Sequence, residues 1–222
     1  MNLPAQLFGH NALLLCSALF AWLLSFAVRR APWKKLLDNP IMFNALIGLS
    51  LSTAVFWQLN AGIRPGFNFH LIGATLFLLM FGWQIALSML TLIMAGSWLY
   101  SGQDLLTLGI NGLLMLAVPM LLSESLLRIC QRHLPKNFFI FVLLNGFASA
   151  AFATILMIIA TSLVLLWQTP YTWAEIQYHY LIPAPILIFA EAFATGAVIT
   201  GFSVSQPEAV MNFSVDDYLT GK

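Results

Sequence analysis

FFIFVLLNGFASAAFATILMIIATSLVLLW, residues 138–167, contains no Asp, Glu, Lys or Arg. A helix needs roughly 17–25 apolar residues to cross the hydrocarbon core of a bilayer, so this run is long enough to span it and to tilt. The whole chain has the same character, because 60% of its 222 residues are hydrophobic and only 8% are charged. Soluble domains are about one quarter charged. The sequence therefore predicts an α-helical integral membrane protein.

Six further apolar runs flank this one, and together they predict a single all-α, polytopic transmembrane domain over residues 1–222 with about seven spans. The third and fourth runs are short and meet at Gly82. One bent or re-entrant element is the alternative to two spans there. In chain order the seven runs are residues 11–28, 41–59, 70–83, 85–100, 108–127, 138–167 and 181–202.

The basic residues predict the orientation in the membrane. Seven crossings with the amino terminus outside place two basic segments, 29–35 and 128–136, and the carboxyl-terminal tail in the cytoplasm. Arg64 is then the only Lys or Arg outside, which is the positive-inside distribution of a bacterial inner-membrane protein. Six crossings would put the second basic segment and the tail on opposite sides. No basic region precedes the first run, so we expect an uncleaved first helix that retains Met1.

Composition and missing motifs exclude several classes of function. The net charge of +1 gives no indication of nucleic-acid binding, and two cysteines are too few for a disulfide framework or a thiolate metal site. The chain has no P-loop, G-x-S-x-G or H-E-x-x-H motif. We therefore expect no enzyme, and an ATP-driven machine would need a separate ATPase chain.

Ionisable and amide side chains inside spans are costly, so each one is a candidate for a site. Glu191, about halfway along the last run, could carry a proton, bind a metal or pair with Arg64. It could equally be a hydrogen-bonding hub between helices. Asn111 lies between Gly109 and Gly112 at the outer end of its run and could line a substrate pathway. Glu124 is expected to form a local ion pair with Arg128, four residues on.

Three of the four histidines fall on the predicted outer side: His10, His70 and His179. Neutral imidazole is the commonest protein ligand for transition metals. The three could converge on one ion, or they could be unrelated side chains at the membrane surface.

Small residues at intervals of four mark helix faces that allow close approach. Ser17, Ala21 and Ser25 form such a face on the first run, and Gly146 with Ala150 and Ala192 with Gly196 do so later. Packing inside the bundle is one explanation. Docking of a second membrane subunit on the first run is the other.

Three short motifs, in order, resemble those of the cobalt- and nickel-binding membrane components of energy-coupling-factor transporters. NFHLIGA at 68–74 resembles the family's S-G-H-L-L-G-G segment, LGIN at 108–111 its L-G-x-N segment, and AEA at 190–192 its G-E-A segment. The order and spacing agree over residues 41–205. Residues 63–70 and 217–222 are similar to a proteobacterial branch of that family.

The resemblance implies a metal site built around the amino terminus. In the family, the terminal amine, the amide and imidazole nitrogens of the second residue, and a later histidine form a square-planar set of four nitrogens. That geometry suits Ni²⁺ and is expected to hold Co²⁺. Met1 and His70 match two of these positions, whereas Asn2 stands where the family has histidine. His10 or His179 could supply the missing imidazole.

The leading hypothesis is therefore a substrate-binding membrane subunit for nickel or cobalt that works with a transmembrane coupling subunit and cytoplasmic ATPases. The metal would be cargo, and no permanently bound cofactor is expected. Asn2 favours a second hypothesis, an accessory or assembly subunit that kept the fold and lost the metal site. A third, an intramembrane enzyme, would need His70 and Glu191 within hydrogen-bonding reach.

Overall fold

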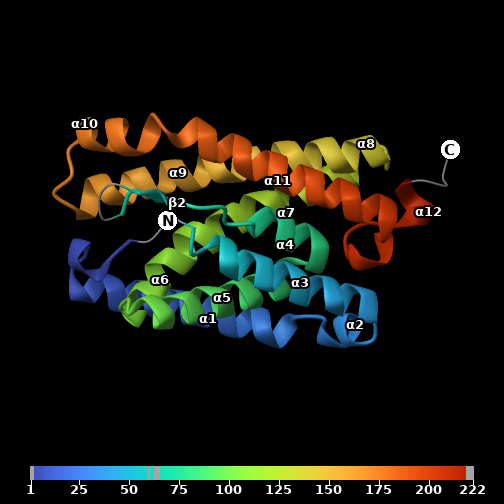
Figure 1. Ribbon diagram of the computed structural model, residues 1–222, viewed down its shortest axis with the longest axis horizontal. Helices are drawn as coiled ribbons and strands as arrows, with labels where there is room; N and C mark the ends of the chain where they lie inside the picture. Colours follow the sequence, from blue (N-terminus) through green and yellow to red (C-terminus); the bar gives the residue numbers. More distant parts are fainter. Residues whose placement is uncertain (1–2, 60, 63–65, 219–222) are drawn as a thin grey trace.

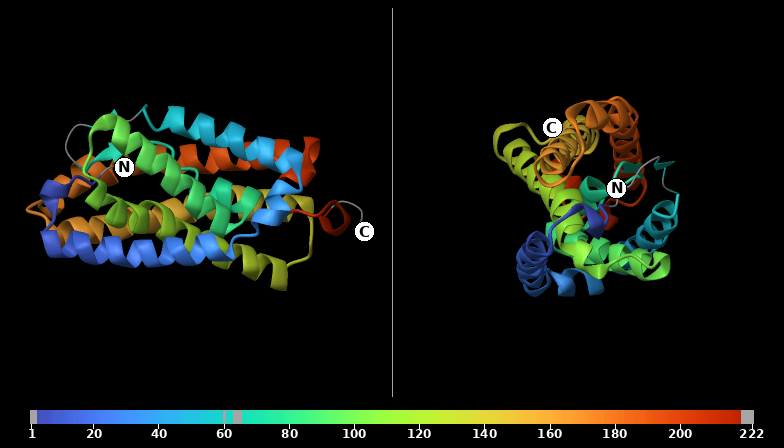
Figure 2. Two further views of the ribbon diagram at one scale, coloured as in Figure 1. Left: turned by 90° about the horizontal axis from the view of Figure 1, so that it is seen from below. Right: turned by 90° about the vertical axis from the view of Figure 1, so that its left-hand side faces the viewer.

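The computed structural model describes residues 3–59, 61–62 and 66–218, which form a bundle of helices aligned along one long axis (Figures 1 and 2). The first half of the chain comprises η1 (Ala5–Leu7), α1 (His10–Arg30), α2 (Trp33–Leu37), α3 (Pro40–Phe56), β1 (Ala61–Gly62), β2 (Asn68–Phe69), α4 (Ala74–Phe81), α5 (Trp83–Ser101), η2 (Leu105–Thr107) and α6 (Leu108–Asn111). The second half comprises η3 (Gly112–Ala117), α7 (Val118–His133), α8 (Phe138–Ile140), η4 (Phe141–Ala148), α9 (Ser149–Gln168), α10 (Trp173–Ile176), η5 (Gln177–Leu181), α11 (Ala184–Ser205), η6 (Pro207–Ala209) and α12 (Val215–Tyr218). Of these, η3, η4 and η5 are π-helical stretches inside longer helices.

The helices have the lengths that the hydrophobic runs predict. Five segments in the described part of the chain are long and apolar enough to cross a membrane: His10–Arg30, Trp83–Ser101, Leu105–His133, Phe138–Gln168 and Trp173–Ser205. The shorter α3 is also apolar. The expectation of an all-α, multi-pass membrane protein is therefore confirmed.

The predicted span at residues 70–83 is not a continuous transmembrane helix, and the number of membrane crossings stays a prediction. Its helix, α4, has only 8 residues and so rises about 12 Å, far less than the roughly 30 Å of the hydrocarbon core. All eight residues are buried, and residues 70–73 before them are not helical. Non-helical backbone at membrane depth is tolerated when protein surrounds it, and the packing of α4 in the middle of the bundle meets that condition (Figure 1).

Glycine and the chain's tail determine where α4 ends. Gly82 has φ of 78°, a conformation that costs a residue with a Cβ atom, and α5 begins at the next residue. The Asn212 amide group donates to the carbonyl oxygens of Leu78 (2.9 Å) and Leu79 (3.2 Å), and the Met211 N–H donates to that of Met80 (2.7 Å). The tail thus satisfies the carbonyls of Leu79 and Met80 at the helix end, while the Leu78 carbonyl also accepts from the Gly82 N–H at 2.8 Å.

Small residues bring pairs of helices into close contact. A Cβ atom on Gly109 of α6 would lie 2.4 Å from the Cα of Ser17 in α1, and one on Gly146 of η4 would lie 3.4 Å from the Cα of Gly196 in α11. The expectation that Gly146 and Gly196 pack inside this bundle is confirmed.

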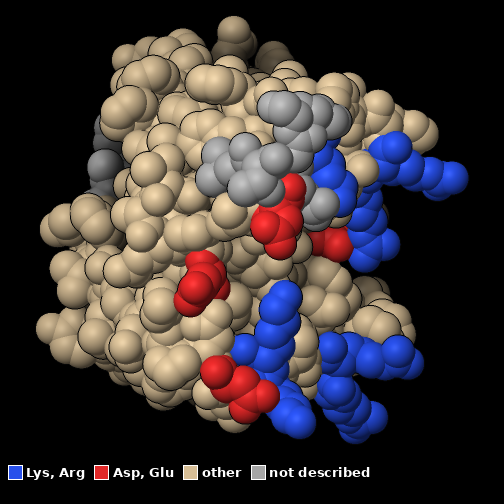
Figure 3. Space-filling model, turned by 90° about the vertical axis from the view of Figure 1, so that its right-hand side faces the viewer, with Lys and Arg blue, Asp and Glu red and all other residues tan. Residues whose placement is uncertain are grey.

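Charge is concentrated at one end of the molecule. Figure 3 shows Lys and Arg gathered on the end at which α2 and α12 lie. In the described ranges these residues come from the ends of α1, α2 and α7 and from the segment before α8: Arg29, Arg30, Lys34, Lys35, Arg128, Arg132 and Lys136. We call this the basic end, and the opposite end, where β2 lies, the hairpin end.

Candidate metal-binding site at the hairpin end

A small β-hairpin leads the chain into the interior at the hairpin end. β1 and β2 pair antiparallel, with Ala61 opposite Phe69 and Gly62 opposite Asn68. His70 follows directly and is buried, and its ring centroid lies 5.2 Å from that of the Trp57 indole. Its Nδ1 atom lies 3.2 Å from the carbonyl oxygen of Leu71. These contacts position an imidazole in the interior of the protein, where a metal ligand would be shielded from solvent.

Glu191 holds the segment between His70 and α4. Its side chain lies on the buried face of α11 and is only 4% exposed. The carboxylate accepts hydrogen bonds from the backbone N–H groups of Ile72 and Gly73, the latter at 3.2 Å to Oε2. Gly73 is the N-cap residue of α4, so the Glu191 carboxyl oxygens lie at the amino-terminal end of this helix, where backbone N–H groups have no acceptor within the helix.

Asn111 holds the amino-terminal segment in the same manner. It is fully buried at the end of α6, and its Oδ1 atom accepts from the N–H of Leu3 at 2.9 Å. Its amide nitrogen donates to the Leu3 carbonyl oxygen at 3.0 Å and to that of Thr107 at 2.9 Å. Leu3 is 1% exposed, so the chain enters the bundle close to its first residue.

The hairpin and the amino-terminal segment are neighbours. A Cβ atom on Gly66, in the turn before β2, would lie 3.2 Å from Leu7 and 3.5 Å from Leu3. A pocket of about 440 Å³ is lined jointly by Pro4, Gln6, Asn68 and Asp104, among other residues. The amino-terminal segment, the hairpin and the loop before α6 therefore meet at one place.

The other two candidate histidines also lie at this end. His10 is exposed as the first residue of α1. His179 is half-buried in η5, with its ring centroid 6.0 Å from that of Phe67 and 5.0 Å from that of Tyr178. Within the described ranges, no group of three or more His, Cys, Asp or Glu side chains is placed to hold a metal ion.

Three residues named from the sequence lie outside the described residues: Met1, Asn2 and Arg64. The partners of Glu191 in the described part are the backbone amides of Ile72 and Gly73. Sequence reasoning did not identify these amides, and only the glycine at the start of a helical run could have indicated them. Sequence reasoning also did not identify Leu3 or Trp57 as residues of the site, because no sequence pattern marks either of them.

The small-residue face of the first run is divided between two environments. The Ser17 hydroxyl donates to the Leu106 carbonyl oxygen at 2.9 Å, so this residue packs within the chain. Ala21 and Ser25 are exposed. The expected ion pair between Glu124 and Arg128 is confirmed, with 2.8 Å between Oε1 and Nε.

Comparisons with known proteins agree with this arrangement. The model of the CbiM family, described as the cobalt uptake substrate-specific transmembrane region, matches residues 2–209. The chain belongs to the CbiM family. Among solved structures, the CbiM-family fold is shared with a truncated transition metal transporter, at a TM-score of 0.69 and 21% identity over 90% of this chain and 96% of that one.

A second solved structure, described as a transition metal transporter, has a TM-score of 0.63 and 20% identity over 92% of this chain and 98% of that one. No curated protein matches the chain. The CbiM match extends over Leu3, His70, Asn111 and Glu191, so the residues that build the hairpin end belong to the family's region.

Replacing Asn111 by leucine should loosen the amino-terminal segment of this CbiM-family chain. Leucine has a similar size but leaves the buried N–H and C=O of Leu3 without partners, at about 1–3 kcal/mol each. Hydrogen exchange followed by mass spectrometry should show faster exchange in residues 3–8, together with a lower unfolding temperature. Gln6→Leu, at an exposed position in the same segment, is the control and should leave both unchanged. Unaltered exchange in the Asn111→Leu protein would show that Asn111 does not hold the segment.

Proposed function

We propose that the chain is the membrane substrate-binding subunit of an energy-coupling-factor transporter that takes up nickel or cobalt. The observation that carries this proposal is a pair of buried side chains that hold backbone segments by hydrogen bonds. Asn111 binds the backbone of Leu3, and Glu191 binds the backbone that follows His70. Each of the two segments that family resemblance identifies as ligand-bearing is therefore held by a buried side chain, which is the support that the ligands of a metal site need.

The ligand chemistry suits these ions. His70 supplies an imidazole from a buried position, and the amino terminus, two residues before the anchored Leu3, would supply further nitrogen donors. Nickel and cobalt accept nitrogen ligands of this kind. Met1 and Asn2 would contribute the terminal amine and an amide nitrogen, and His10 or His179 would supply the imidazole that Asn2 lacks.

The charge distribution supports an orientation with seven crossings, the amino terminus outside and the basic end in the cytoplasm of a bacterial inner membrane (Figure 3). Metal ions would then reach the hairpin end from outside. The coupling subunit and the ATPases would engage the protein from within the membrane and from the cytoplasm. The exposed Ala21 and Ser25 on α1 offer a small-residue face for the coupling subunit.

The test is the metal content of purified protein with a native, untagged amino terminus, measured by elemental mass spectrometry. Wild-type protein should hold nickel or cobalt near one ion per chain, and His70→Ala should lose at least about nine-tenths of it because a buried ligand is removed. The matched control is His133→Ala, which removes an exposed imidazole from the last turn of α7, at the basic end. If His70→Ala retains its metal, the proposed site is refuted. If His10→Ala loses metal as well, His10 is a ligand.

An accessory or assembly role is the second candidate, and Asn2 is the observation that favours it, because an amide side chain is a poor ligand for these ions. The wild-type protein would then hold no metal even after loading. Neighbouring genes separate the two candidates independently: ATPase and coupling-subunit genes favour transport, and genes of an unrelated membrane complex favour the accessory role.

A further inference from the structure

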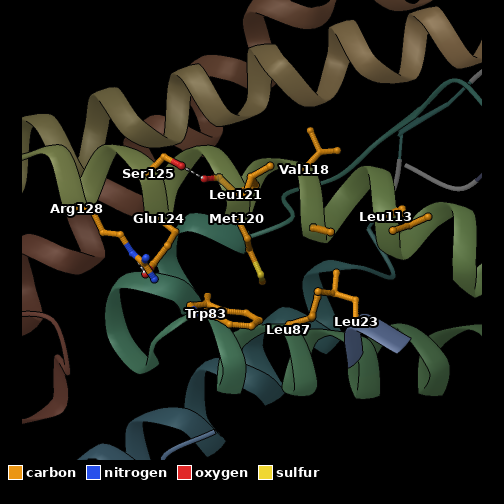
Figure 4. Close-up of a pocket in the computed structure, with 11 residues that line it drawn as sticks. Leu23, Trp83, Leu87, Leu113, Val118, Met120, Leu121, Glu124, Ser125 and Arg128 are labelled. Carbon is orange, nitrogen blue, oxygen red and sulfur yellow. Dashed lines mark hydrogen bonds and ion pairs between the residues drawn. The ribbon is translucent and has the colours of Figure 1, made fainter. Parts of the chain in front are cut away.

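A lateral groove lies between α1, α5 and the long helix formed by η3 and α7, and it extends from Leu113 to Arg128. Its volume is about 520 Å³. Leu23 contributes from α1, Trp83 and Leu87 from α5, and a row of residues from Leu113 to Arg128 from the η3–α7 helix. Figure 4 shows these side chains facing one another across the groove, with Leu113 near one end and Arg128 at the other.

The groove is apolar along its length and polar at one end. Glu124, Ser125 and Arg128 form the polar end, where Arg128 Nε donates to Glu124 Oε1 at 2.8 Å. The Arg128 side chain is 70% exposed and that of Glu124 is 22% exposed, so the guanidinium faces outward while the carboxylate holds it in position. This polar end of the groove lies at the basic end of the molecule.

Aromatic side chains line the rim beside this polar end. Phe26 of α1 stacks on Trp83 with 6.1 Å between ring centroids, and Trp22 stacks on Phe26 with 6.3 Å between centroids. The guanidinium of Arg30 lies 5.5 Å above the Phe26 ring. Indole rings and arginines at one level are typical of the border between hydrocarbon and headgroups. The groove therefore opens at headgroup level and extends into the hydrocarbon.

The groove is too short to continue across the whole hydrocarbon core of a bilayer. From Leu113 to Arg128 the helix rises about 22 Å at 1.5 Å per residue, against about 15 Å for the hydrocarbon of one leaflet and 30 Å for both. A transmembrane helix of a partner would need an apolar surface that continues across the full core. An acyl chain whose headgroup lies at Arg128 needs only this length.

The charges around the polar end indicate which class of lipid headgroup the groove would bind. Arg128 lines the groove and Arg30 lies over the Phe26 ring beside it, against Glu124 as the single carboxylate among the residues that line the groove. Arg128 donates one N–H to Glu124. Its guanidinium has further N–H donors, in a planar geometry that matches the oxygens of a phosphate group. The excess positive charge favours a lipid with net negative charge over a zwitterionic one.

We propose that this groove is a binding site for an anionic phospholipid of the leaflet at the basic end, with an acyl chain along Leu23, Leu87 and Leu113 and the phosphate on Arg128. The site does not depend on metal binding. It would anchor the α1–α5–α7 side of the bundle in the membrane, on the face where three helices leave a gap that no side chain of the described residues fills.

Native mass spectrometry of the full chain, released from nanodiscs with equal amounts of phosphatidylglycerol and phosphatidylcholine, tests the site. Wild-type protein should retain one phosphatidylglycerol in preference to phosphatidylcholine. Arg128→Gln should reduce that preference about tenfold, the usual weight of a charge-assisted phosphate contact. Lys35→Gln on α2 removes the same charge from the basic end outside the groove and should leave the preference unchanged.

A second variant tests the acyl-chain part of the site separately. Ala117→Phe places a ring in the groove and should reduce retention of both lipids, with the unfolding temperature confirming that the protein is folded. Equal retention of the two lipids by wild type, or a full preference in Arg128→Gln, would overturn the proposal. So would an Ala117→Phe protein that keeps its lipid but loses a co-purifying membrane subunit, because the groove would then be a helix-docking surface.

Discussion

Gly109→Ala should yield little folded protein, although it adds a single methyl group. The added Cβ atom would lie 2.4 Å from both the Cα and the backbone nitrogen of Ser17, and a backbone atom cannot rotate away as a side chain can. α1 and α6 would have to separate, which would also break the hydrogen bond from the Ser17 hydroxyl to Leu106. We expect a loss of about 3 kcal/mol or more, the upper part of the range for overpacked positions.

The measurement is the yield and unfolding temperature of detergent-solubilised protein after size-exclusion chromatography. Gly96→Ala on α5 is the matched control, because a Cβ atom there meets nothing within 4 Å. Alanine is the better helix former by up to about 1 kcal/mol, so Gly96→Ala should leave stability unchanged or raise it. Equal behaviour of the two variants would mean that α1 and α6 do not pack as closely as the structure shows.

Glu191→Ala should release the amino-terminal end of α4 and, under the proposed function, also abolish metal retention. The change leaves the buried N–H groups of Ile72 and Gly73 without an acceptor, at about 1–3 kcal/mol each. Hydrogen exchange should rise across residues 72–78, with a lower unfolding temperature. Glu191→Gln keeps an oxygen acceptor and should lose less than half as much stability.

Glu124→Ala provides the control for removal of a carboxylate from a helix. Its ion pair with Arg128 is partly exposed, and such i,i+4 pairs contribute at most about 0.5 kcal/mol. Both the exchange of α4 and the metal content should therefore stay at wild-type values. Unchanged exchange at residues 72–78 in Glu191→Ala would show that the carboxylate is not what holds this segment, and the site would need another explanation.

Particular residues show how far the sequence leads. The apolar runs predict the long helices because hydrophobic length is a local property, and the i,i+4 pair of Glu124 and Arg128 follows from helix geometry alone. The run at 70–83 looks like a short span by the same criterion. It contains only the buried α4, because hydropathy does not distinguish a segment surrounded by protein from one surrounded by lipid.

The sequence by itself determined the fold class, the segments available for crossing the membrane, the separation of basic residues and the candidate roles of His70, Asn111 and Glu191. Only the tertiary structure decided what those residues contact. Asn111 meets Leu3 across 108 positions of sequence, and Glu191 meets Ile72 across 119. Such pairs depend on how α6 and α11 pack against the rest of the chain. A buried polar side chain must find a partner, but its own residue type does not specify which backbone group that will be.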